Sequence, residues 1–166
     1  MKILLYSDNP MLQSGYGKIT GFVAKHLRAQ GHDVIILGSD PRQLPFAPSP
    51  FEFEGCKVFP VQEYGNAEHI RYLLREEKPD IIWANSDPHF FAHMFKMDNE
   101  IRKQCPLVFY HLWDDGPFPK YNIPYYSSCD RIIAGSRFTF DLLMQSGVVD
   151  TARVDYAPIG FDSTTW

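Results

Sequence analysis

The feature that most constrains the fold of this chain is the regular alternation of short apolar runs with segments of helical period. The runs are nearly continuously apolar, which is typical of strands covered on both faces of a parallel sheet. The predicted strands span residues 2–6, 33–37, 57–61, 80–84, 107–110, 130–134 and 153–156. Strands that alternate with helices form right-handed βαβ units, so the sequence predicts an α/β fold, a Rossmann-like open parallel sheet with helices on both faces.

Helical segments lie between most of these runs. The predicted helices span residues 18–30, 67–78, 88–103 and 138–145. Asn66, Asp87 and Ser136 stand where side chains cap free N–H groups, and Gly31 and Gly147 stand where helices end. Two segments rich in proline and aromatic residues, 46–64 and 114–126, are predicted to be irregular, apart from the strand at 57–61 and short helical pieces in the second.

Length and composition exclude several classes of protein. The 166 residues are about the size of one domain, and the net charge of −4 argues against a nucleic-acid partner. No apolar run is long enough for a transmembrane segment, although a peripheral contact with a membrane stays open. Cys56, Cys105 and Cys129 are far apart and form no CxxC pair. They are predicted to be buried thiols of a protein in the reducing cytoplasm.

A glycine-containing loop follows the first predicted strand. Gly15, Tyr16 and Gly17 lie just before a helix, where bare backbone and free N–H groups can receive phosphate or sugar oxygens. An ordinary turn that touches no ligand explains the same residues equally well. The glycine spacing is not GxGxxG, and no Walker sequence occurs, so a dinucleotide or P-loop site is disfavoured.

His111 follows a buried strand directly, at the edge of a parallel sheet where ligands bind. It is a candidate for a hydrogen bond to a sugar hydroxyl, with a neighbouring carboxylate, Asp114 or Asp115, to orient its ring; Asp114 is also a candidate substrate-binding residue. A histidine bonded only to backbone is the alternative. Asp114 and Asp115 are unsuited to a metal because adjacent side chains point apart, and the pair His89 and His93 lacks a third ligand. A metal site on either pair is therefore disfavoured.

An aromatic cluster lies after this histidine. Its members are Phe118, Tyr121, Tyr125 and Tyr126. They are suited either to stacking on a sugar ring or to covering the edge of the sheet.

Taken in order, these landmarks resemble the N-terminal domain of retaining, nucleotide-sugar-dependent glycosyltransferases of the GT-B architecture, the group 1 or glycogen-synthase-like superfamily. The resemblance covers nearly the whole chain. It rests on the segments SGYGKITGFVAKHLRAQGHDVIIL, REEKPDIIWA, FYHLWDD, DRIIAGSRFTFDLL and APIGFDSTTW. In that family a segment like 158–162 closes the first domain and opens the linker to the second, so residues 158–166 are expected to begin an interdomain linker.

The resemblance implies roles for several residues. Gly15 and Gly17 would line the cleft near the donor phosphate and the acceptor, and His111 would contact the transferring sugar. Ser136 and Arg137 would also face the cleft. The implied reaction moves a sugar from a nucleotide diphosphate to an acceptor hydroxyl with retention, with no metal or other cofactor. The sequence names neither the sugar nor the acceptor.

The family has a second, donor-binding domain, and these 166 residues are expected to lack it. Residues 1–166 are therefore expected to be an acceptor-side half that transfers nothing by itself. The alternatives are a non-catalytic Rossmann-like binding module and the acceptor subunit of a two-chain glycosyltransferase. A flavodoxin-like or dehydrogenase-like domain is disfavoured by the glycine spacing, with Asp40 the only candidate acid after the second strand.

Overall fold

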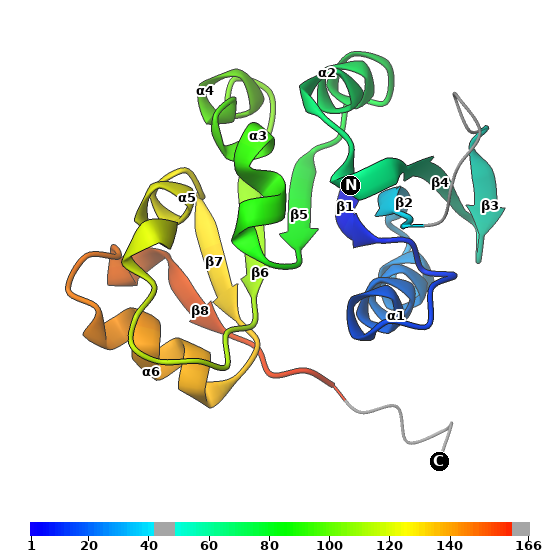
Figure 1. Ribbon diagram of the computed structural model, residues 1–166. Coiled ribbons are helices and arrows are strands. Elements are labelled where there is room, and N and C mark those ends of the chain that lie inside the picture. The colour runs from blue at the N-terminus through cyan, green and yellow to red at the C-terminus, as the bar shows by residue number, and fades with distance from the viewer. Residues whose placement is uncertain (42–48, 161–166) are drawn as a thin grey trace.

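The computed structural model describes residues 1–41 and 49–160 and is built on one sheet. The strands are β1 Lys2–Asp8, β2 Asp33–Ser39, β3 Phe51–Phe53, β4 Cys56–Val61, β5 Ile81–Asn85, β6 Leu107–His111, β7 Arg131–Ala134 and β8 Val154–Tyr156. They lie in the order β3-β4-β2-β1-β5-β6-β7-β8 (Figure 1). Strand β3 pairs antiparallel with β4, and every other neighbouring pair is parallel. The predicted Rossmann-like open sheet is confirmed.

The strand order reverses at β1. The chain runs outward through β2 to β4 and then returns to β5, on the other side of β1. Tyr6 of β1 is paired with Leu37 of β2 and with Ala84 of β5, so the three strands end at nearly the same level. In open parallel sheets such a reversal marks the crevice where ligands bind.

Helices cover both faces of the sheet, but unequally. They are α1 Gly15–Ala29, α2 Ala67–Glu76, α3 Ala92–Phe95, α4 Asp98–Ile101, α5 Ile123–Ser127 and α6 Arg137–Gln145, with 3-10 turns at Gln62–Tyr64, Pro88–Phe91, Lys120–Asn122 and Thr151–Arg153. Alternate residues of β1 enter two apolar clusters, with Leu4 and Tyr6 in one and Leu5 in the other. The first cluster contains core residues of α2 to α6, whereas the second is covered by α1.

One predicted helix, over residues 88–103, is wrong as a continuous element. The structure divides it into a 3-10 turn and the short helices α3 and α4. Phe91 and Phe95 are buried in the first part, and Met97 and Ile101 in the second. On one unbroken helix the second pair would lie about a third of a turn away from the first. The break rotates both pairs toward the sheet.

The predicted cap at Asp87 is also corrected. Asp87 occupies the N-cap position of this segment and Pro88 its first turn, but the carboxylate makes no capping hydrogen bond. The predicted caps at Asn66 and Ser136 are confirmed, because each side chain accepts a hydrogen bond from a backbone N–H of its helix. Pro88 thus favours the start of the turn after β5 without a capping hydrogen bond from Asp87.

The segment 46–64 is more regular than expected. Strands β3 and β4 form an antiparallel pair joined at Glu54 and Gly55, both with positive φ. Part of the segment falls in residues 42–48, outside the described residues. The structure confirms the strand predicted at 57–61, within β4.

The three cysteines are free and buried, as predicted. Burial raises the pKa of each thiol, to about 11 for Cys105. Among the described residues no helix is both long and apolar enough to cross a bilayer.

Candidate functional site

The loop between β1 and α1 is held by its own side chains. Asn9 is buried, donates from Nδ2 to Asp40 Oδ2 at 3.0 Å and accepts from the N–H of Met11 at 3.0 Å. Ser14 caps α1 by accepting from the N–H of Gly17 at 2.9 Å, and its hydroxyl donates to Asp8. Because Ser14 is the cap, α1 begins at Gly15, earlier than the apolar stripe predicted.

The two loop glycines have different surroundings. A Cβ placed at Gly17 would lie 2.7 Å from the carbonyl oxygen of Leu12 and 2.9 Å from that of Asn9. A Cβ at Gly15 would meet no heavy atom within 4 Å. The chain's own loop therefore requires glycine at position 17, whereas the backbone at Gly15 is open to a ligand.

The hydroxyl of Tyr16 experiences the negative charge of three carboxylates. Its pKa is raised to about 12, first by burial and then by the negative charges of Asp87, Asp114 and Asp8. These three carboxylates come from the ends of β5, β6 and β1. The N-terminus of α1 thus lies in a negative field, which favours a neutral ligand with hydroxyl donors over a phosphate there.

Tyr64 joins the ends of β1 and β5. Its hydroxyl donates to Asp8, and Ser86 Oγ lies 2.7 Å from the same phenol oxygen. Since a phenol has one hydrogen, Ser86 is the donor in the second bond. Burial and the bond to Asp8 raise the pKa of Tyr64, so its phenol stays protonated at neutral pH.

His111 is the last residue of β6 and is completely buried. Its Nε2 lies 2.9 Å from the hydroxyl of Tyr126 in α5. The ring also contacts the rings of Phe109 and Trp113, with centroids at 5.6 and 5.8 Å. Burial lowers the pKa of His111 to about 3, so the imidazole is neutral at physiological pH.

Four buried side-chain polar atoms of the described residues lack a hydrogen-bond partner. They are both amide atoms of Asn85, Nδ1 of His111 and Nε1 of Trp113. All belong to the carboxyl ends of β5 and β6, the edge where ligands bind in such sheets. Buried polar groups without partners are uncommon in native proteins and mark places where a ligand or water completes the site.

Asn85 and Trp113 were missed among the sequence-predicted site residues. The available signal was their position, in the segments NSDP and YHLWDD at the ends of two predicted strands. Trp113 is fixed by α6, because the hydroxyl of Thr139 donates to its carbonyl at 2.9 Å and accepts from its N–H at 3.0 Å.

Ser136 and Arg137 lie at the start of α6, as predicted. The hydroxyl of Ser136 accepts from the N–H of Thr139 at 3.0 Å, so it is already engaged as a cap. The exposed guanidinium of Arg137 pairs with Asp141 at 3.0 Å. Arg137 is thus a basic group on the sheet edge near His111, since Ala134 of β7 pairs with His111 of β6.

The remaining candidate ligands are dispersed. His93 Nε2 bonds the hydroxyl of Tyr6 at 2.8 Å, whereas the ring of His89 packs on Phe90. Asp114 and Asp115 are exposed. Across residues 1–41 and 49–160 no group of three or more His, Cys, Asp or Glu side chains is arranged to hold a metal ion.

The aromatic cluster divides between the core and the surface. Tyr126 is buried in the main core cluster, and Phe118 and Tyr125 pack against it. Tyr121 is 68% exposed and contacts the ring of Trp113 edge-on at 6.2 Å. Tyr121 is therefore the member of the cluster best placed to meet a ligand.

The start of the expected linker crosses the carboxyl edge of the sheet (Figure 1). The N–H of Ile159 donates to the carbonyl of Gly135 at 3.2 Å, and Tyr110 donates to the carbonyl of Ala157 at 3.0 Å. At Gly160 an added Cβ would lie 3.7 Å from the ring of Phe22 in α1. Residues 161–166 of the expected linker lie outside the described residues.

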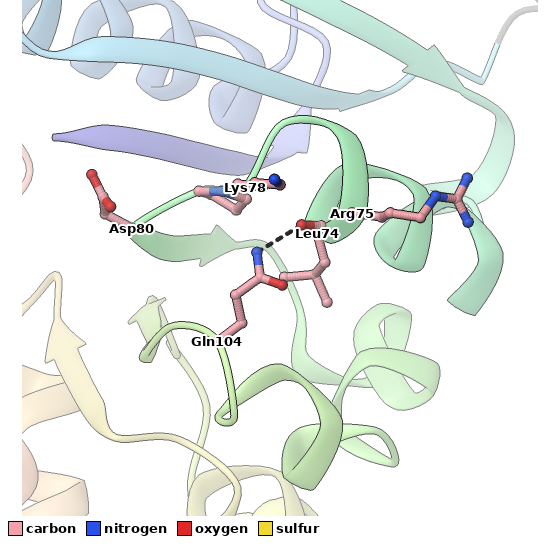
Figure 2. Close-up of a pocket in the computed structure, with 6 residues that line it drawn as sticks. Leu74, Arg75, Lys78, Asp80 and Gln104 are labelled. Carbon is pink, nitrogen blue, oxygen red and sulfur yellow. Dashed lines mark hydrogen bonds between the residues drawn. The ribbon is translucent and has the colours of Figure 1, made fainter.

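A hollow of about 380 Å³ lies at the opposite edge of the sheet. It is lined by Leu74, Arg75, Lys78, Pro79, Asp80 and Gln104, and Figure 2 shows the bond from Gln104 to the carbonyl of Leu74. Asp80 directly precedes β5 and Gln104 lies shortly before β6, so the hollow is at the amino ends of the strands. It is separate from the site around His111.

Comparison with known proteins gives a family and a fold. Residues 14–165 match the family model described as Glycosyltransferase Family 4. No curated protein matches the sequence. Among solved structures, a glycosyltransferase from Rickettsia africae ESF-5 is similar with a TM-score of 0.61 and 17% identity, over 97% of this chain and 43% of that chain.

Two further solved structures share the fold. An alpha-glucosyltransferase in complex with UDP and a 13-mer DNA has a TM-score of 0.59 and 15% identity, over 94% of this chain and 41% of its own. The E. coli protein described as trehalose-6-phosphate, bound with UDP-2-fluoro glucose, has a TM-score of 0.56 and 14% identity, over 99% of this chain and 50% of its own.

The chain spans half or less of the length of these three proteins. At such identities the likeness shows the fold, which is that of the N-terminal Rossmann-like half of a GT-B protein. The family model, by contrast, covers nearly the whole sequence. The chain therefore belongs to the family described as Glycosyltransferase Family 4, and the expected resemblance to GT-B glycosyltransferases is confirmed.

Proposed function

We propose that this chain is the acceptor-side half of an enzyme that transfers a sugar from a nucleotide-diphosphate sugar to an acceptor hydroxyl with retention. The family match supports glycosyl transfer. Neighbours solved with UDP and with UDP-2-fluoro glucose support a nucleotide-sugar donor. The observation that carries the proposal is the set of buried, unpartnered polar atoms of Asn85, His111 and Trp113 at the ligand-binding edge.

We assign His111 to the transferring sugar. Its ring is neutral at pH 7 because burial lowers its pKa to about 3, so it acts as a hydrogen-bonding group and holds no positive charge.

Charge divides the site into two parts. The carboxylates of Asp8, Asp87 and Asp114 act on Tyr16, so Gly15, Tyr16 and Asp114 suit acceptor hydroxyls. Ser136 and Arg137, at the N-terminus of α6, suit the donor side, where a diphosphate leaves. The same carboxylates and the net charge of −4 oppose a polyanionic acceptor such as the DNA bound by one neighbour.

We propose that transfer needs no metal. The departing diphosphate would be stabilised by basic side chains and helix N-termini, part of which the donor-binding half would supply. Addition of EDTA should therefore leave the rate of transfer unchanged. The free, buried cysteines support a reducing, cytoplasmic location.

The test uses the protein encoded by the complete natural reading frame. It is assayed with a panel of nucleotide sugars for release of nucleoside diphosphate, and the anomeric configuration of the product is determined by NMR. We expect turnover with retention for at least one donor. His111→Ala should lower kcat more than tenfold, within the range for loss of a transition-state contact, whereas His89→Ala should not change it.

If no donor gives release of nucleoside diphosphate, or if His111→Ala keeps full activity, the proposed function is overturned. An inverted product would overturn retention alone. If the natural reading frame ends at Trp166, the same assay is run with the chain encoded beside it, because a two-chain enzyme would then be required.

A further inference from the structure

A chain of three buried side chains ends at His111. Asn122 Nδ2 donates to the hydroxyl of Tyr126 at 3.3 Å, and that hydroxyl lies 2.9 Å from His111 Nε2. All three residues are buried. The direction of each hydrogen bond is therefore set by how many hydrogens the three groups carry.

The phenol of Tyr126 has one hydrogen to give. Since Asn122 donates to the phenol oxygen, the phenol hydrogen is free to point at Nε2 of His111. Nε2 then accepts with its lone pair. A neutral imidazole carries one proton, so that proton must be on Nδ1.

Nδ1 of His111 is buried and has no partner among the described residues. The indole N–H of Trp113, whose ring contacts the imidazole, is likewise buried and without a partner. Both groups are hydrogen-bond donors in this arrangement, and leaving a donor buried and unpaired is costly. The missing partner is an acceptor oxygen.

We propose that Tyr126, held by Asn122, fixes the proton of His111 on Nδ1, so that the end of β6 offers its ligand a neutral N–H donor and no base. Tyr126 and Asn122 are positioning residues that act through His111. The ligand group that completes the site is a hydroxyl or carbonyl oxygen. Only the naming of that oxygen as part of a sugar rests on the proposed function.

The first test needs no substrate. The protein is labelled with 15N-histidine, and long-range 1H–15N correlation spectra at neutral pH identify which ring nitrogen of His111 is protonated. We expect the Nδ1–H tautomer. An Nε2–H tautomer in the wild type would overturn the proposal, because Tyr126 would then accept from His111 and donate to Asn122.

Two variants test the source of the preference. In Tyr126→Phe the ring remains beside Phe118 but the hydroxyl is lost, so the Nε2–H tautomer should become populated. In Asn122→Asp a carboxylate can only accept, so Tyr126 should turn its hydrogen away and His111 should shift to Nε2–H. Tyr125→Phe is the matched control. Tyr125 belongs to the same helix as Tyr126, but its ring stacks on Phe95. An unchanged tautomer in Tyr126→Phe would overturn the role of Tyr126.

The second test measures transfer by the full enzyme. Tyr126→Phe should lower kcat tenfold to a hundredfold, as when an outer partner of a working imidazole is removed, with a smaller change in the KM of the donor. Tyr125→Phe should retain the wild-type rate. If the tautomer shifts as expected but no donor is turned over by the wild type, the proposed function fails and the inference stands. If transfer occurs and Tyr126→Phe keeps full kcat, the positioning role fails.

Discussion

Gly15 and Gly17 are separated by one residue but differ in what a side chain would meet. At Gly17 the obstacles are backbone oxygens of the preceding loop, which cannot move aside without disrupting the cap at Ser14. At Gly15 the space is open. The same residue type therefore serves packing at one position and leaves room for a ligand at the other.

We expect Gly17→Ala to destabilise the protein by about 1–3 kcal/mol, the usual cost of overpacking. This exceeds the gain of about 0.5–1 kcal/mol that alanine brings to a helix. Gly15→Ala should be neutral or stabilising by up to about 1 kcal/mol. Urea unfolding of both variants checks the difference, and equal stabilities would show that Gly17 is not confined as described.

His111 should make stability depend on pH. Its pKa is about 3 in the folded protein and its ordinary value is 6.5, so the unfolded state binds more protons between these values. The free energy of unfolding is therefore highest at high pH, where His111 is neutral in both states. It decreases as the pH falls below the ordinary pKa of histidine. The loss approaches about 1.4 kcal/mol per pH unit at most.

The measurement compares the wild type with His111→Gln by urea unfolding between pH 6 and pH 4. The free energy of unfolding of the wild type should fall faster than that of the variant, because only the wild type carries this histidine. His93, whose pKa is also lowered by burial, is present in both proteins and cancels. Parallel pH profiles would contradict the burial of a neutral imidazole at position 111.

At the scale of elements, two helix starts that look alike in sequence differ in their capping. Asn66 accepts from the N–H groups of Glu68 and His69, and His69 accepts in return from the N–H of Asn66. Asp87 has no such bond. A residue of capping type in the sequence thus marks the start of a turn, whether or not its side chain forms the capping hydrogen bond.

Asn66→Ala should destabilise the protein by about 1 kcal/mol, the typical value for loss of an N-cap. Asp87→Ala should change stability by less than about 0.5 kcal/mol, as at surface sites without such a bond. Thermal or urea unfolding of the pair provides the comparison. A larger loss of stability in Asp87→Ala than in Asn66→Ala would contradict the assignment of Asn66 as the residue with a capping bond and Asp87 as the residue without one.

The strands and α2 were predictable because local pattern and tertiary burial agree there. The apolar run at β1 is buried on both faces of the sheet, and the stripe of Ile70, Leu73 and Leu74 in α2 is buried on one face of its helix. The broken helix after β5 was not predictable in the same way. The burial of Met97 depends on the sheet beneath it, and periodicity within the segment does not contain that information.

At the scale of the whole molecule, the sheet and its ligand edge followed from the alternation of strands and helices. The position of His111 at that edge also followed, since it comes directly after a strand. Its contact with Tyr126 did not, because the two residues are fifteen positions apart and the chain between them has no regular period in the sequence. Tyr126 was recognised in the sequence only as part of an aromatic cluster.

The 166-residue chain by itself should bring about no turnover of a nucleotide sugar. If the proposed function holds, the reason is electrostatic, since an acceptor-side half would supply only part of the positive charge that a departing diphosphate requires. Incubation with the donor that the full enzyme uses, followed by a nucleoside diphosphate assay, measures this. Release above the uncatalysed rate would show that this half carries a complete active centre.

The reactivity of the three buried thiols can also be used to follow unfolding of the protein. Cys56 lies on β4, while Cys105 and Cys129 lie shortly before β6 and β7, so they sample separate parts of the sheet. With raised pKa values they should resist alkylation while the chain is folded and react rapidly once it opens. Mass spectrometry after a short pulse of iodoacetamide would then show whether the two sides of the sheet unfold simultaneously or one after the other.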